Sequence, residues 1–290
     1  PVQVETVCWI SASKIVLSTF FYLSALICYI QYMRNSKWQY LLASVVSSIL
    51  AMGCKEQSVI IVPCLLLFDW MLFKRNMRSL KVYIEKVYYL IPAIAIFIVT
   101  LVANKNTGEE IIGYTIVDRF IFLCYSSFKY LLISAIPFKL SYLYPFPFQV
   151  GEKIPMALWI YPFVILFIGY VIYLNRRKPL LVFCTLFFIL HLLPVLHVIP
   201  LPRYVVAADR YLYIPYIAFA IGLSILSYHL YERQRKWILY AGFLYCSYLC
   251  VYTAGYAPAW KNSDTLKEHF KEVLKKRETN LSINFKHEKQ

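Results

Sequence analysis

Long apolar stretches alternate with short polar segments along almost the whole chain. A helix of about 20 apolar residues, with a usual range of roughly 17 to 25, crosses the hydrocarbon core of a bilayer. We predict membrane-spanning helices at residues 15–33, 38–54, 58–73, 87–103, 156–174, 180–199, 211–231 and 237–257. The pattern therefore predicts an all-α, polytopic membrane protein with about eight spans, of which the second and third are short.

A further apolar stretch, at residues 120–137, carries Lys129 near its middle. A charged side chain at the centre of a bilayer is costly. We therefore expect an interfacial or re-entrant helix here, with Lys129 turned towards headgroups or protein. The alternative is a ninth span in which Lys129 has a partner inside the protein.

Basic residues between the predicted spans indicate the orientation, because cytoplasmic loops hold an excess of Lys and Arg. If residues 120–137 enter and leave on the same side, four short connections contain most of the basic residues before the tail. These are Arg34, Lys37, Lys74, Arg75, Arg78, Lys81, Lys86, Arg176, Arg177, Lys178, Arg233, Arg235 and Lys236. We therefore place these connections in the cytoplasm. The first residues, the turn at 55–57, the segment 104–155, the loop 203–210 and the tail are then extracytoplasmic.

The composition agrees with a membrane protein. Hydrophobic residues make up 60% of the 290 residues, and the mean hydropathy is +0.58, far above that of a soluble domain. The formal charge of +15 belongs mainly to the cytoplasmic connections and the tail, and the aromatic residues lie in and beside the spans, so we expect no nucleic-acid partner. We expect a multi-pass protein of a bacterial inner membrane, or of the endoplasmic reticulum membrane in a eukaryote, in which a further span precedes Pro1.

Motifs for metals and cofactors are missing from the sequence. It has no Walker loop, no GxGxxG, no GxSxG and no HExxH motif. The eight cysteines lie in or beside apolar stretches without a CxxC pair, as packed small side chains do. We predict no metal site and no cofactor, although the sequence leaves a divalent metal open.

Charged residues gather on the predicted extracytoplasmic side, at the ends of apolar spans. Because topology brings them to one face, we expect them to form one site, together with a neighbouring tyrosine. Lys and Arg neutralise phosphate, Arg with bidentate geometry, so such a site suits a substrate with an anionic head and an apolar tail. The expected site residues are Glu5, Lys55, Glu56, Arg203, Asp209, Arg210 and Tyr211.

Structural alternatives exist for several of these charges. Asp209 and Arg210 can form an ion pair that ties a loop to a span, and Lys55 with Glu56 can be a solvated tight turn. Neighbours in sequence do not face each other on a helix, so we expect Lys55 and Glu56 to have different partners. On the cytoplasmic side, we expect Asp69 to face headgroups or to pair with the Lys74-Arg75 pair.

Five segments of the chain resemble, in the same order, the membrane region of tetratricopeptide-containing GT-C glycosyltransferases. These enzymes are relatives of the transmembrane and tetratricopeptide-repeat O-mannosyltransferases. The most specific element is the Asp-Arg-Tyr-x-Tyr-x-Pro stretch. The segments are 1–10 followed by Lys14 and 17–18, then 54–57, 144–147, 208–215 and 260–263, with the sequences PVQVETVCWI, K, LS, CKEQ, YPFP, ADRYLYIP and WKNS. The resemblance covers roughly residues 1–270.

The resemblance implies a transmembrane GT-C-like domain at residues 1–257, and a soluble extracytoplasmic tail at 258–290 that is a degenerate link to tetratricopeptide repeats. It implies transfer of mannose or another hexose from a polyprenyl-phosphate carrier to an acceptor hydroxyl, on protein or glycan. The cations Arg210, Arg203 and Lys55 would bind the donor phosphate, and Glu5, Glu56, Asp209 and Tyr211 would orient them or contact the sugar. The catalytic carboxylate is expected upstream of Pro1.

The alternative is a protein of the same fold without catalytic activity, such as a membrane scaffold or a transporter of lipid-linked glycans. It is supported by Ser13 and Ile15, which flank Lys14 where the family tends to have Arg and Asp, and by the short tail in place of repeats.

Overall fold

The computed structural model describes residues 1–103, 113–141, 144–197, 205–232, 237–269 and 271. These residues form helices and no β-strand, and one isolated antiparallel bridge joins Tyr144 to Ala207. The α-helices are α1 (Val4–Cys8), α2 (Ser13–Asn35), α3 (Trp38–Cys54), α4 (Ile61–Met71), α5 (Leu80–Ala103), α6 (Ile116–Ala135), α7 (Ile160–Leu174), α8 (Pro179–Leu192), α9 (Pro215–Glu232) and α10 (Trp237–Tyr256). The 3₁₀-helices are η1 (Ile10–Ala12), η2 (Glu56–Ile60), η3 (Met156–Trp159), η4 (Leu193–Val195), η5 (Asp209–Leu212) and η6 (Ala257–Trp260). The predicted all-α class is confirmed for this part of the chain.

Four helical segments are long and apolar enough to cross a membrane, as expected of a membrane protein. They are Ile10–Asn35, Leu80–Ala103, Met156–Leu174 and Trp237–Trp260, and Trp38–Cys54 and Pro179–Val195 are shorter apolar helices. Local structure shortens two of the predicted stretches. The third begins as the 3₁₀-helix η2, which leaves 11 residues in α4, and Pro194 lies just beyond the end of α8, where it has no N–H to continue the helix. The count of eight spans stays a prediction.

Helix α5 begins earlier than predicted. It starts at Leu80 rather than at residue 87, so Glu85 and Lys86 belong to the helix and are buried, with 6% and 3% of their surfaces exposed. The predicted topology placed Lys86 in a loop, whereas the structure places it in helix α5. Both side chains are paired with opposite charges, and this pairing offsets the cost of burying them. The predicted helix began after these two residues because their burial was not expected.

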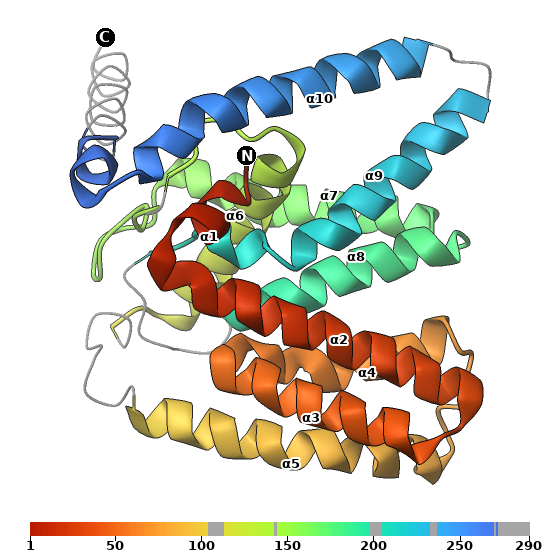
Figure 1. Cartoon of the computed structure of the whole chain (residues 1–290). Coiled ribbons are helices and arrows are strands. Elements are labelled where there is room, and N and C mark those ends of the chain that lie inside the picture. Colours follow the sequence, from red (N-terminus) through yellow and green to blue (C-terminus); the bar gives the residue numbers. More distant parts are fainter. Residues whose placement is uncertain (104–112, 142–143, 198–204, 233–236, 270, 272–290) are drawn as a thin grey trace, which may run out of the picture.

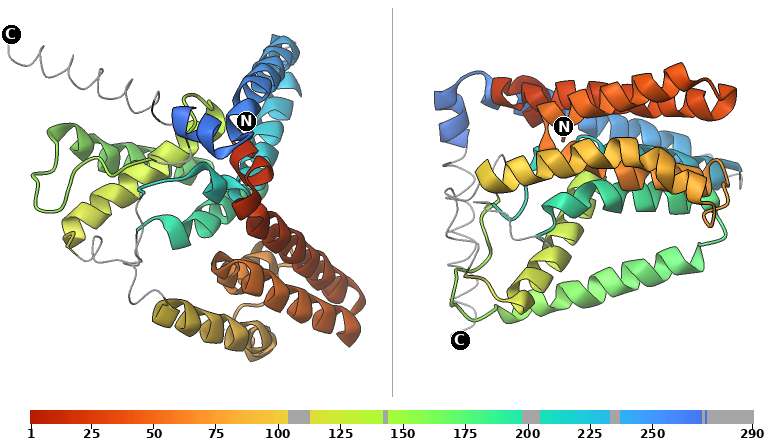
Figure 2. Two further views of the ribbon diagram at one scale, coloured as in Figure 1. Left: turned by 60° about the vertical axis from the view of Figure 1, so that its left-hand side comes forward. Right: turned by 90° about the horizontal axis from the view of Figure 1, so that it is seen from below.

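The polar connections between the helices lie at two opposite ends of the helical bundle (Figure 1). The turn between α2 and α3, the connection from α4 to α5 and the turn between α7 and α8 all lie on the right of Figure 1, and they carry basic residues at 34–37, 74–81 and 176–178. We call this the basic end. Helix α1 lies at the other end, where it contacts η5 and η6. The view from below keeps the same division (Figure 2).

Helix α6 corresponds to the predicted interfacial or re-entrant stretch and starts with a capping box. The Thr115 hydroxyl accepts the Asp118 N–H at 3.2 Å, and the Thr115 N–H donates to the Asp118 carboxylate at 2.7 Å. The helix runs obliquely to α7 (Figure 2) and is not among the four candidate spans. Lys129 lies 5.2 Å from the centre of the Tyr144 ring, so it faces protein. Its depth in the membrane stays a prediction.

Candidate functional site

A buried ion pair joins two segments that are far apart in the sequence and that the predicted topology placed on one face. The Arg210 guanidinium donates from Nη1 to Glu5 Oε1 at 2.6 Å, and the Arg210 backbone N–H donates to Glu5 Oε2 at 2.9 Å. Glu5 is fully buried, and the Arg210 side chain is 18% exposed. Both carboxylate oxygens are thus occupied by one residue, which fixes α1 against η5.

Aromatic rings surround the guanidinium of this pair. Its central carbon lies 5.1 Å from the Tyr211 ring centre and 5.6 Å from that of Trp9. Trp9 itself packs on Trp260 of η6, with ring centres 5.9 Å apart. The rings limit the rotamers of Arg210 and shield it from water, which strengthens its electrostatic interactions.

Asp209 is buried and its carboxylate is held by Tyr144. Its Oδ1 accepts from the Tyr144 hydroxyl at 2.8 Å, while its buried Oδ2 has no hydrogen-bond partner among the described residues. Burial, and secondarily the charge of Glu5, raise the pKa of Asp209 well above its usual value. The acidic partner of Arg210 in this structure is Glu5, so the alternative in which Asp209 and Arg210 pair with each other is not seen.

Tyrosines of α10 hold the segment that leads to Tyr144. The hydroxyls of Tyr245 and Tyr248 donate to the carbonyls of Ala135 and Pro137 at 2.7 and 2.6 Å, and the Leu140 N–H donates to the Tyr252 hydroxyl at 3.1 Å. The first bond satisfies a carbonyl that α6 leaves open in its last turn, and the other two satisfy backbone groups of the segment that follows. They also position the loop whose Tyr144 contacts Asp209.

Lys55 and Glu56 are partners of each other, contrary to expectation. The ammonium of Lys55 lies 2.7 Å from Glu56 Oε1. Lys55 is extended, with φ −149° and ψ 119°, so the two residues are not consecutive helical positions and the helix argument does not apply. Although burial acts in the opposite direction, the Lys55 charge lowers the pKa of Glu56.

Lys55 and Arg210 line one cavity of about 40 Å³, although they are far apart in sequence. The cavity lies between α2, η2, the end of α8 and the η5–α9 junction. Tyr211 lines it as well. Glu5, Glu56 and Asp209 are not among the lining residues, but Glu5 pairs with Arg210 and Glu56 with Lys55. The structure thus brings together six of the seven predicted residues at one end of the helices. Arg203 lies outside the described residues.

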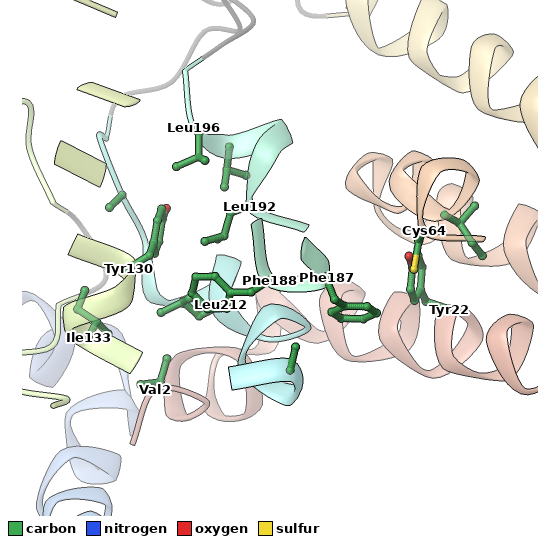
Figure 3. Packing of buried hydrophobic residues seen from close by; sticks show 14 of the residues in the cluster. Val2, Tyr22, Cys64, Tyr130, Ile133, Phe187, Phe188, Leu192, Leu196 and Leu212 are labelled. Carbon is green, nitrogen blue, oxygen red and sulfur yellow. The ribbon is translucent and has the colours of Figure 1, made fainter. Parts of the chain in front are cut away.

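Five further polar residues of the cavity lining were not predicted from the sequence. They are Ser18, Thr19, Tyr22, Ser58 and His191. Figure 3 shows the labelled neighbours Tyr22, Cys64 and Phe187, which come from three different helices. A repeated polar position on the apolar α2, at 18, 22 and 29, was the available signal, because such a stripe marks the face turned towards protein.

A second charged cluster lies at the basic end. Lys86 Nζ is 2.6 Å from Asp69 Oδ2, Arg75 Nη1 is 2.6 Å from Glu85 Oε2, and the Tyr29 hydroxyl donates to Asp69 Oδ1 at 2.6 Å. Arg75 also lies 3.4 Å from Asp69, as the sequence had suggested. The cluster links α2, α4 and α5 with two positive and two negative charges, so its formal charge is zero.

Among the described residues, no group of three His, Cys, Asp or Glu side chains is placed to hold a metal ion. No protein-family model, curated protein or solved structure matches the chain. The resemblance to GT-C glycosyltransferases therefore stays a prediction from the sequence.

Proposed function

We propose that the protein is a GT-C-type glycosyltransferase that takes a hexose from a polyprenyl-phosphate carrier at the extracytoplasmic face of the membrane. The observation that carries the proposal is that Lys55 and Arg210 line one cavity at the ends of apolar helices. Two cations beside a bilayer suit a ligand with an anionic head and an apolar tail. The acceptor is a hydroxyl on protein or glycan.

The two cations have different roles in this proposal. Arg210 has five N–H donors, more than its bond to Glu5 uses, and its planar group matches phosphate oxygens. Lys55 adds a point charge to the lining of the same cavity. When the bond from sugar to phosphate breaks, negative charge develops on the departing phosphate, and fixed cations stabilise it without reorganisation.

The neighbouring acidic residues divide by burial. Glu5 and Asp209 are almost fully buried, at 0% and 1% exposed, so they orient Arg210 and the loop around it. The Glu56 side chain is 43% exposed and can contact sugar hydroxyls from the rim. Tyr211 keeps the guanidinium in place from the cavity wall.

Replacing Arg210 tests the proposal. The full-length protein is returned to membranes of a strain that lacks it, and radiolabelled polyprenyl-phosphate mannose is supplied; transfer is measured as label that leaves the lipid fraction. Arg210→Ala should reduce transfer by about a hundredfold or more, as expected for the loss of a transition-state cation. Lys55→Gln should act in the same direction.

Arg176→Ala is the matched control. Arg176 stacks on Tyr173 at the basic end, 3.9 Å from the ring centre, and its loss should leave transfer unchanged. Expression and thermal stability of each variant are measured in parallel. Transfer at the normal rate by a folded Arg210→Ala protein would remove Arg210 from the site and, with it, the proposal.

A scaffold or lipid-linked-glycan transporter with the same fold is the second candidate. One observation favours it: both cavity cations are already paired with carboxylates. In that case the wild-type protein would bind polyprenyl phosphate and transfer no sugar from any lipid-linked hexose.

A further inference from the structure

The cavity lined by Lys55 and Arg210 has two chemically different kinds of lining. The cations provide hydrogen-bond donors, and Ser18, Thr19, Tyr22 and Ser58 add side chains that carry hydroxyl groups. A hydroxyl can donate its proton or accept through oxygen lone pairs. Which of these a ligand meets depends on where each hydroxyl proton already goes.

The serine and threonine protons are directed into the protein. The Ser18 hydroxyl donates to the Ala51 carbonyl at 2.8 Å, and a carbonyl can only accept. In the 2.7 Å contact between Ser18 and Ser58, the donor must therefore be Ser58. The Thr19 hydroxyl donates to the Ile15 carbonyl at 2.8 Å. All three oxygens thus meet a ligand as acceptors.

The Tyr22 proton is directed away in the same manner. His191 Nδ1 lies 2.8 Å from the Phe187 carbonyl, so Nδ1 carries the hydrogen. In a neutral imidazole, Nε2 is then an acceptor, and the Tyr22 hydroxyl at 2.8 Å must donate to it. Cys64 also contacts this hydroxyl. A thiol is a weak hydrogen-bond donor, so a P–O–H group can displace it as the donor to the Tyr22 oxygen.

Size limits what can occupy the cavity. A volume of about 40 Å³ corresponds to roughly three water molecules, at about 10–15 Å³ each. A phosphate group approaches this size, whereas a hexose ring is several times larger. The anionic group, not the sugar, therefore fits between the cations and the hydroxyl oxygens.

We propose that this cavity selects a phosphate group that carries a proton. Lys55 and Arg210 bind its unprotonated oxygens, and Tyr22 with Ser58 accepts the hydrogen bond from its P–O–H group. The ligand class is hydrogen phosphate, or the singly protonated head of a phosphate monoester such as the carrier lipid after sugar transfer. This inference rests on the proposed function for the anion itself and adds the recognition of the proton.

Sulfate and hydrogen phosphate provide a direct test. At about pH 8 both are dianions of similar shape, but only hydrogen phosphate has a proton to donate. Binding to the purified full-length protein in nanodiscs is measured by calorimetry. We expect phosphate to bind about tenfold more tightly than sulfate, because a hydrogen bond to a charged group has about this effect. Equal affinities would overturn the inference while leaving an anion site in place.

Two variants locate the acceptor. Tyr22→Phe and Ser58→Ala should each weaken phosphate binding severalfold to tenfold and leave sulfate binding unchanged. Unchanged sulfate affinity also shows that the fold and the cations are intact. Tyr88→Phe and Ser24→Ala, which remove hydroxyls elsewhere on the helices, should change neither affinity. If Tyr22→Phe does not fold, Ser58→Ala and the wild-type ratio still decide the question.

Further ligands distinguish a lipid head from free phosphate as the source of the bound group, and they distinguish failure of this inference from failure of the proposed function. At about pH 5, where farnesyl phosphate, inorganic phosphate and dimethyl phosphate are all mainly monoanions, only dimethyl phosphate lacks a P–O–H proton. Farnesyl phosphate should then bind more tightly than inorganic phosphate if the ligand is a lipid head, and dimethyl phosphate should bind more weakly than inorganic phosphate. Tighter binding of inorganic phosphate than of farnesyl phosphate would assign the site to free phosphate. Absence of binding by every anion would refute the proposed function and this inference together.

Discussion

Glu5 and Arg210 lie 205 positions apart in sequence, yet both oxygens of the Glu5 carboxylate accept hydrogen bonds from Arg210. The pair fastens α1, the first helix of the chain, onto η5 at the end of the bundle that contains the cavity. Because one partner is fully buried and the other lines the cavity, the same contact stabilises the fold and holds the cation in position.

Replacing Glu5 by Gln should destabilise the protein. Arg210 would lose its charged partner, and breaking a buried pair typically costs about 3–5 kcal/mol; we expect the lower end, about 3 kcal/mol, because Arg210 retains some exposure. The measurement is thermal unfolding in detergent. Glu268→Gln, at an exposed position, is the control. A melting temperature of Glu5→Gln equal to that of the wild type would show that the pair is energetically unimportant.

Asp209 should make stability depend on pH. Its pKa is raised in the folded state by burial, so the folded protein binds more protons than the unfolded one above the ordinary Asp pKa of about 4. Stability should therefore fall as pH rises from about 4 through the raised pKa. Asp209→Asn should remove this slope and raise the melting temperature at neutral pH. Parallel pH profiles for the two proteins would contradict the assignment.

The charged cluster at the basic end should be sensitive to the loss of one member. Lys86→Met leaves Asp69, which is fully buried, without its 2.6 Å partner, and we expect a loss of about 3 kcal/mol. Lys81→Met, on the same helix but exposed, should have almost no effect. Adding Asp69→Asn to Lys86→Met should restore part of the stability. Equal effects of Lys81→Met and Lys86→Met would argue against a specific pair.

The orientation can be tested at the two ends of α2. This helix has 23 residues and is therefore about 35 Å long, enough to cross a hydrocarbon core of about 30 Å. Single cysteines at Ser11 and Lys37, both exposed, are introduced into a protein without the native eight. An impermeant maleimide should label Ser11→Cys in intact cells and Lys37→Cys only after permeabilisation. The reverse pattern would place the cavity in the cytoplasm.

Much of the fold was predictable because long apolar stretches determine where membrane helices form. The helices at 38–54 and 160–174 agree closely with their predicted stretches. The start of α5 was missed because a single sequence does not show that Lys86 and Glu85 find partners from α4 and the following connection. In the sequence alone, a charged residue whose partner is unknown looks like the end of a membrane helix.

The candidate site was predictable only as a set of charges on one face. Topology predicted that Glu5, Lys55 and Arg210 would meet, and the structure brings them together. Their pairing was not predictable, because it depends on local backbone geometry: Lys55 is extended, and the Arg210 N–H reaches Glu5. The Tyr22–His191 contact joins residues 169 positions apart, and no local pattern indicates it.

The central claim is that the cavity holds the phosphate of a polyprenyl carrier, and photocrosslinking tests it most directly. A polyprenyl phosphate with a diazirine beside the phosphate is irradiated with the full-length protein in nanodiscs, and the labelled peptides are identified by mass spectrometry. We predict labelling within residues 15–22, 55–60 and 210–215, competition by unmodified polyprenyl phosphate, and loss of labelling in the double variant Lys55→Gln/Arg210→Gln. Labelling confined to other helices, or unchanged in the double variant, would contradict the account.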